Sequence, residues 1–125
     1  MQVRRLCWLG IRVDAEAYEP TVGFLRDVLG MRVEFAEETT VELSLESGDR
    51  VQVFAPGDRY HDFFGAHARG PVVALFEVDE VRAARDELVA AGIEIGGEHE
   101  RDAEWEWVSF RAPDGNLYEL ASRVS

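Results

Sequence analysis

The side chains that could carry out covalent or metal chemistry are few. All 13 basic residues are arginines, so no lysine is available for a Schiff base or for a phosphate-binding loop. The single cysteine, Cys7, excludes an intrachain disulfide, and none of the serines stands in a nucleophile-elbow pattern. Three histidines, His61, His67 and His99, limit any histidine-rich metal site. The sequence therefore contains no recognisable nucleophilic arrangement.

The most conspicuous aromatic feature is a pair of tryptophans two residues apart. Trp105 and Trp107 fall on one face of a predicted strand, with Glu104 and Glu106 between them. Such a pair is typical of sheet packing or of a dimer contact. The alternative is an aromatic wall that stacks on a flat or cationic ligand, which the acidic background would favour.

The charge balance restricts the partners. Against 13 basic residues stand 25 Asp and Glu, giving a net charge of −12 and a pI near 4.6. Nucleic-acid binding needs a concentrated positive field, so we expect no nucleic-acid partner. Because no long apolar run or signal-like segment is present, we also expect no membrane partner and a cytoplasmic location.

The 125 residues suffice for one domain, and within it two halves resemble each other. Alternating apolar residues predict a first strand in each half, at 6–13 and 72–78. A helical pattern follows each of them. In the first half, residues 14–19 precede the predicted helix and Pro20 stands near its beginning. In the second half, Asp79 is the expected N-cap of the helix. Gly30 and Gly92 are the expected helix stops. Three further strands follow in each half, predicted at 31–36, 40–45 and 50–55, and at 93–98, 104–111 and 116–121.

A nearly constant displacement between the halves indicates a duplicated βαβββ unit. Val13 corresponds to Val78 at an offset of 65, and Gly48 corresponds to Gly115 at an offset of 67, which aligns Gln52 with Glu119. The single domain 1–125 is thus predicted to comprise module one (1–56), a connection (57–70) and module two (71–125). The connection is rich in aromatic residues and is either a lid or a hydrophobic plug between the modules.

The segments FLRDVLGM (24–31), FEVDEV (76–81) and PDGNLYEL (113–120) carry a family resemblance. Together with the paired modules they make the chain resemble the vicinal oxygen chelate (VOC) superfamily of glyoxalases, bleomycin-resistance proteins and extradiol dioxygenases. The resemblance implies an α+β fold in which two βαβββ modules form a cup-shaped, curled mixed β-sheet with helices on the outside. Relatives often hold a divalent metal in the cup, and the scaffold hosts both enzymes and pure binders.

In metal-using relatives, the ligands lie on the first and last strands of each module. The resemblance transfers these positions to Trp8, Gln52, Val73 and Glu119, of which only Glu119 matches fully and Gln52 is a weak ligand. A catalytic metal typically needs about three protein ligands. We therefore expect no cofactor, while a divalent metal held by Gln52, Glu119 and a histidine of the connection remains an alternative.

Strand alternation assigns further residues to the cup. Arg12 and Phe54 share the cup face with Trp8 and Gln52, and Glu77 shares it with Val73. Arg12 and Glu77 occupy equivalent positions with opposite charge, so they could approach each other across the cup, or Arg12 could bind a ligand carboxylate or phosphate there. Cys7 falls on the opposite face, in the core beneath the helices, where a thiol is usually inert.

The leading interpretation is a homodimeric small-molecule-binding protein of the bleomycin-resistance type. Its cup would bind a neutral or cationic, partly aromatic ligand, with Glu119 as polar anchor or as general acid or base. The expected ligand-binding residues are Trp8, Arg12, Gln52, Phe54, Val73, Glu77, Trp105 and Trp107. The rival interpretations are a glyoxalase-like lyase, isomerase or dioxygenase with a rearranged metal site, and an interaction module whose cup is filled by its own side chains.

Overall fold

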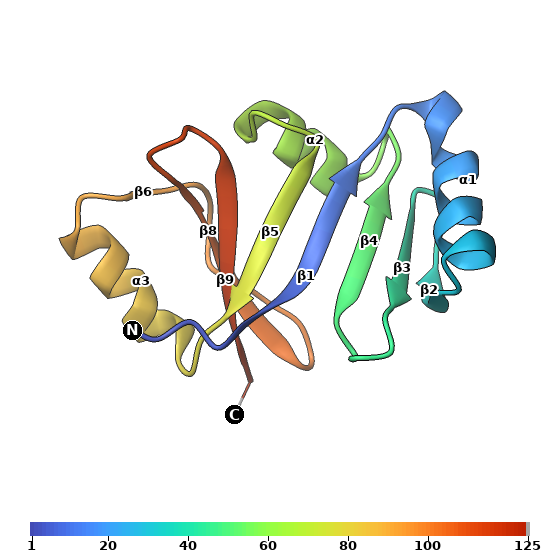
Figure 1. Ribbon diagram of the computed structural model, residues 1–125. Helices are drawn as coiled ribbons and strands as arrows, with labels where there is room; N and C mark the ends of the chain where they lie inside the picture. Colours follow the sequence, from blue (N-terminus) through green and yellow to red (C-terminus); the bar gives the residue numbers. More distant parts are fainter. Residues whose placement is uncertain (125) are drawn as a thin grey trace.

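A single curled sheet of nine strands forms the body of the protein (Figure 1). The computed structural model describes residues 1–124. The sheet order is β2-β3-β4-β1-β5-β9-β8-β6, and β7 pairs with β8 away from this path. The predicted α+β class and curled mixed sheet are confirmed. The strands are β1 (Arg5–Arg12), β2 (Arg32–Ala36), β3 (Thr40–Ser44), β4 (Arg50–Phe54), β5 (Val72–Glu77), β6 (Glu94–Ile95), β7 (Glu100–Arg101), β8 (Trp105–Arg111) and β9 (Leu117–Arg123).

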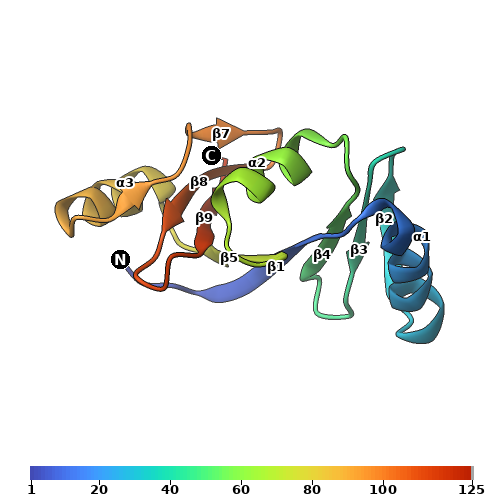
Figure 2. The ribbon, with the colours of Figure 1, turned by 90° about the horizontal axis from the view of Figure 1, so that it is seen from above.

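The two halves pair their strands in the same way. In the first half β1 pairs in parallel with β4, and in the second β5 pairs in parallel with β9. The halves join edge to edge through the antiparallel pair β1·β5 of the same chain. Seen from above, the sheet curves upward on both sides of this central pair, which produces the concave face (Figure 2).

Helices α1 (Ala15–Gly23) and α3 (Val81–Ala90) cover the outer face of the sheet (Figure 2). Beneath α1 a core cluster joins Tyr18 and Val22 to Leu43 and Val53 of the sheet. Beneath α3 the corresponding cluster joins Val81 and other residues to the second half of the sheet. These two cores hold the modules in shape, so that the concave face is free for other roles.

Both outer helices begin at positions that differ from the prediction. The first begins at Ala15 because the carboxylate of Asp14 accepts a hydrogen bond from Ala17 N at 3.0 Å, so Pro20 lies inside the helix. A π-helical turn, η1 (Phe24–Val28), continues it. The α3 cap is Glu80 rather than the predicted Asp79, whose carboxylate is bound by Arg4 at 2.6 Å.

The predicted helix stops are confirmed at both glycines. Gly30 and Gly92 have φ values of 72° and 80°, in the left-handed region that other residues rarely adopt. Among the described residues 1–124, no helix is long and apolar enough to cross a membrane.

A third helix, α2 (Arg59–His67), occupies the segment predicted only as a connection. It lies on the concave side of the sheet, over one end of the cup (Figure 2). Its buried Phe64 packs with Phe54, Val73 and Leu117 in a third apolar cluster. The connection therefore acts as a plug at that end, which leaves the rest of the concave face open.

Candidate functional site

A cleft of about 810 Å³ occupies the open part of the concave face. Strands from both modules and the N-terminal part of α2 contribute its walls. Six predicted site residues line it: Trp8, Gln52, Phe54, Trp105, Trp107 and Glu119. The structure thus brings together residues up to 111 positions apart in the sequence, from Trp8 to Glu119.

Trp8 partly fills the floor of the cleft and is held there by polar and aromatic contacts. Its Nε1 donates to Gln52 Oε1 at 3.2 Å, and Gln52 Nε2 donates in turn to Thr40 Oγ1 at 3.0 Å. The indole folds back over Gly10, where a Cβ atom would lie 2.4 Å from Trp8 Cη2. The absence of a side chain at Gly10 is therefore what allows Trp8 to lie flat against the sheet.

Glu119 is the most strongly perturbed acid of the cleft. Its side chain is almost fully buried, and its Oε2 accepts a hydrogen bond from Ser109 Oγ at 2.8 Å. Burial raises the pKa of Glu119 to about 7, and this effect outweighs the Ser109 hydrogen bond, which acts in the opposite direction. Near neutral pH the Glu119 carboxyl can therefore either donate or accept a proton at the cleft wall.

A second polar group of the cleft, Glu42 on β3, was missed by sequence reasoning. Its Oε1 accepts a hydrogen bond from Arg50 Nη1 of β4 at 2.6 Å. Burial raises the pKa of Glu42, partly offset by the hydrogen bond and charge of Arg50. Strand alternation could have identified both Glu42 and Arg50. Arg50 lies on the same face of β4 as Gln52 and Phe54. It pairs with Ser44 of β3, and Glu42 lies two residues from Ser44 and therefore on the same face.

The two tryptophans of β8 line the cleft together, as their spacing predicts. Trp105 and Trp107 are both half-buried, and the guanidinium of Arg123 lies 4.2 Å from the Trp105 ring centroid. Glu104 binds that guanidinium at 3.4 Å. Glu106 lies on the other face of β8, where its Oε2 contacts Arg82 Nε and His99 Nε2. The hydrogen bond from His99 lowers the pKa of Glu106, with Arg82 adding to the effect.

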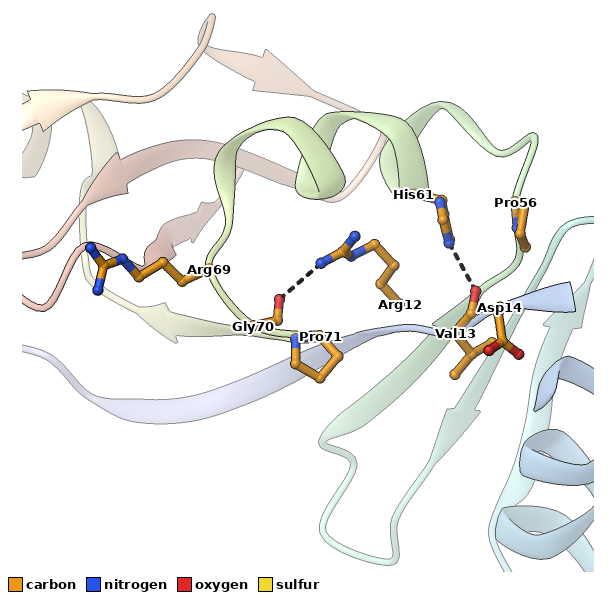
Figure 3. A pocket seen from close by; sticks show the side chains of 8 residues that line it. All are labelled: Arg12, Val13, Asp14, Pro56, His61, Arg69, Gly70 and Pro71. Atoms are coloured by element: carbon orange, nitrogen blue, oxygen red, sulfur yellow. Dashed lines mark hydrogen bonds between the residues drawn. The ribbon is translucent and has the colours of Figure 1, made fainter. Parts of the chain in front are cut away.

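The predicted approach of Arg12 and Glu77 is wrong. Because β1 and β5 are antiparallel, equivalent positions in the two modules lie at opposite ends of the pair. Glu77 pairs with Arg5, whose Nε lies 2.7 Å from Glu77 Oε1, and Arg12 N donates to Pro71 O at the other end. Neither Arg12 nor Glu77 lines the cleft, and Arg12 passes beneath α2 instead (Figure 3).

Val73 was also predicted to face the ligand, and it lies too deep to do so. It is 1% exposed and packs within the apolar cluster under α2. The position is on the concave face, as alternation predicts, and α2 covers it. The error follows from the unrecognised helix rather than from the strand assignment.

Cys7 lines the cleft, although alternation placed it beneath the helices. The register of β1 shifts between Leu6 and Trp8, so that Cys7 is the extra residue of a β-bulge. This bulge turns both Cys7 and Arg5 toward the concave face. Cys7 is nevertheless buried, and burial raises the pKa of its thiol to about 11, which keeps it unreactive at neutral pH.

The donor set does not fit the metal implied by the family resemblance. The four ligand positions carry an indole (Trp8), an amide (Gln52), an isopropyl group (Val73) and a carboxylate (Glu119). Within residues 1–124, no three His, Cys, Asp or Glu side chains group closely enough to hold a metal ion. Among the described residues, no histidine lines the cleft. His61 of α2 lies outside the cleft, where its Nε2 is 2.8 Å from Val13 O. The described side chains of the cleft supply too few ligands for a catalytic metal.

Comparison with known proteins agrees with this architecture. Residues 10–120 match the family described as Glyoxalase/Bleomycin resistance protein/Dioxygenase superfamily. No curated protein matches the chain.

Three similar solved structures illustrate the range of proteins with this fold. A superfamily member from Vibrio splendidus 12B01 aligns with a TM-score of 0.67 and 17% identity, covering 97% of this chain and 99% of its own. Methylmalonyl-CoA epimerase from Mycobacterium tuberculosis aligns with a TM-score of 0.70 and 23% identity over 98% and 90% of the two chains. The Mn(II)-bound glyoxalase from Novosphingobium aromaticivorans aligns with a TM-score of 0.72 and 19% identity, over 96% of this chain and 39% of that longer one.

Proposed function

The chain belongs to the glyoxalase/bleomycin resistance protein/dioxygenase superfamily, and from this premise we propose that it binds a small neutral or cationic, partly aromatic molecule in the cleft. The binding uses no metal. The observation that carries the proposal is the composition of the cleft wall, where three tryptophans lie beside the buried acid Glu119 and the partly buried acid Glu42. Aromatic faces and carboxylates together are the groups that recognise organic cations.

The charges of the cleft support a ligand without negative charge. Four arginines line it, and a carboxylate within 4.0 Å binds each of them. The pairs are Arg5 with Asp49 and Glu77, Arg50 with Glu42, Arg59 with Glu100, and Arg123 with Glu104. An anionic ligand would have to displace one of these carboxylates, whereas a cation would not.

The titration of Glu119 distinguishes the two ligand types. A cation near Glu119 favours the ionised carboxylate, so its affinity should rise as the pH increases through about 7. A neutral ligand that accepts a hydrogen bond from the protonated Glu119 should show the opposite trend. The sign of the pH dependence therefore reports the role of Glu119 as an anchor.

We further propose that the protein works as a homodimer. Apolar side chains are exposed along η1 and β2, two elements that lie at one edge of the molecule (Figure 1). The exposed fractions are 50% for Phe24, 71% for Val28, 53% for Leu29, 38% for Val33 and 40% for Phe35. A second copy covering this edge would remove these side chains from water.

A calorimetric screen of aromatic amines and neutral aromatic compounds tests the proposal. We expect at least one saturable ligand whose affinity falls about tenfold or more in Trp107→Ala and, for an amine, in Glu42→Gln. Glu38→Gln is the matched control because Glu38 is exposed and lies outside the cleft. Metal analysis of protein purified without chelators is the second arm. A stoichiometric metal that is lost in Glu119→Ala would overturn the metal-free proposal.

A further inference from the structure

A second pocket, of about 310 Å³, lies beneath α2 and shares no lining residue with the cleft. It is located where β1 leads into α1 and where residues 69–71 lead into β5 (Figure 3). Its lining includes Arg12, His61, Arg69 and Asp14. The sequence reading placed Arg12 in the cup, and the structure assigns it to this separate pocket.

The guanidinium of Arg12 has fewer partners than its five N–H donors require. Its Nε is buried without a hydrogen-bond partner among the described residues, and Nη2 makes one long contact, 3.5 Å to Gly70 O (Figure 3). Gly65 of α2 leaves room for it, since a Cβ atom there would lie 3.1 Å from Arg12 Nη1. Arg12 as a whole is only partly buried and lines the pocket, so a guanidinium with so few protein contacts is available there to an anion.

Carboxylates bind most arginines of this acidic protein, but not those of the pocket. Nine of the 13 arginines form ion pairs within 4.0 Å among the described residues. Arg12 and Arg69 form none in that part of the chain, and they line the same pocket. In a chain with 25 acidic residues, two arginines without an ion pair at one pocket indicate a site for an anion, with Arg12 inside it and Arg69 at its rim, extending away from Arg12 (Figure 3).

The other polar side chains of the pocket are already engaged. Asp14 Oδ1 accepts a hydrogen bond from Ala17 N at 3.0 Å as the cap of α1. His61 Nε2 lies 2.8 Å from Val13 O, which can only accept, so Nε2 is the donor. Neither Asp14 nor His61 forms a hydrogen bond or ion pair with the Arg12 guanidinium among the described residues, so its remaining N–H donors are available to a ligand.

We propose that this pocket binds the carboxylate of a small monoanionic molecule, with Arg12 as its principal partner and Arg69 at the rim. Two arginines and one aspartate give the lining a formal charge of +1, which matches a monoanion. The net charge of −12 opposes a dianion more strongly than a monoanion. A planar carboxylate also fits two parallel N–H donors of a guanidinium. The proposal is independent of ligand binding in the cleft.

Nuclear magnetic resonance with acetate as the probe tests the site. The backbone amides of Arg12 and Gly70 and the Arg12 Nε–H are followed as sodium acetate replaces sodium chloride at constant ionic strength. We expect saturable shifts with a midpoint in roughly the millimolar range, as for one charge-assisted contact to a small ion. Shifts that do not saturate, or that chloride reproduces, would overturn the proposal.

Variants separate the site from general charge effects. Arg12→Gln should weaken acetate binding about tenfold or more, and Arg69→Gln should weaken it several-fold. Arg85→Gln, which removes an arginine of α3 without a carboxylate partner in the described chain, should leave it unchanged. If Arg12→Gln does not fold, Arg69→Gln alone decides the outcome. Unchanged affinity in the folded pocket variants, or tighter binding of inorganic phosphate than of acetate at a pH where phosphate is mainly dianionic, would refute the assignment.

Discussion

The burial of Glu119 should make the stability of this protein depend on pH in a way that one substitution removes. The ordinary pKa of 4.5 applies in the unfolded chain, and the folded protein raises it to about 7. The folded state therefore binds more protons than the unfolded state between these two values. Ionisation of Glu119 costs stability as the pH rises, and the cost is complete above pH 7.

The size of the effect follows from the two pKa values. The difference between 4.5 and about 7 corresponds to about 3 kcal/mol of unfolding free energy. In Glu119→Gln this contribution is absent, while the titration of all other groups is shared with the native protein. The stability difference between the variant and the native protein should therefore shift in favour of the variant by about 3 kcal/mol between about pH 4.5 and pH 8.

Urea denaturation of both proteins at several pH values measures this difference. Only the change of this stability difference with pH is compared, so a constant cost of placing an amide beside Ser109 cancels. Glu104→Gln, which removes a carboxylate that is 71% exposed, is the control for the general loss of one negative charge. A Glu119→Gln difference that stays constant within about 1 kcal/mol would refute the account of Glu119 as a buried, protonated acid.

Three further predictions concern the anchoring of α2, the cap of α3 and the thiol of Cys7. Phe64→Ala should cost about 3–5 kcal/mol because the ring is 2% exposed, whereas Val89→Ala, at 52% exposure on α3, should cost less than about 1 kcal/mol by urea denaturation. Glu80→Ala should cost about 1 kcal/mol, because the Glu80 carboxylate caps α3 through Arg82 N and Ala83 N. Cys7, with a thiol pKa of about 11 and 6% exposure, should react with an aromatic disulfide reagent near neutral pH only as fast as the chain unfolds.

Each of these predictions has a result that contradicts it. Similar losses in Phe64→Ala and Val89→Ala would mean that α2 is not anchored in the apolar cluster. An unchanged stability of Glu80→Ala would remove Glu80 as the cap. Rapid labelling of Cys7 in native conditions, with a rate independent of urea, would show that the β-bulge leaves the thiol accessible.

Much of the fold was predictable because its signals are local. Apolar alternation and the two glycine stops located the long strands and both outer helices to within a few residues. The short strands were less predictable: β6 contains two residues where six were expected, and β7 was not expected at all. Their extent depends on pairing with β8, which the sequence of either segment does not reveal.

The helix α2 shows why a local pattern can be insufficient. Its apolar residues Tyr60, Phe63 and Phe64 share one helical face at i, i+3 and i+4, but this stripe covers little more than one turn and Gly65 follows it directly, so the pattern is too short to mark a helix by itself. The helix is stabilised by the burial of Phe64 against strands of both modules. Such a segment becomes recognisable only when the concave face that it covers is known.

The sequence by itself determined the duplicated plan, the scarcity of metal ligands and the residues that alternate onto the concave face, because these follow from residue type and from the period of a strand. Only the tertiary structure decided which of them share a space. The extra residue at Cys7 turned Arg5 inward, the antiparallel β1·β5 pair separated Arg12 from Glu77, and α2 covered Val73. Each of these outcomes depends on register and contact between segments distant in the chain, which local periodicity does not encode.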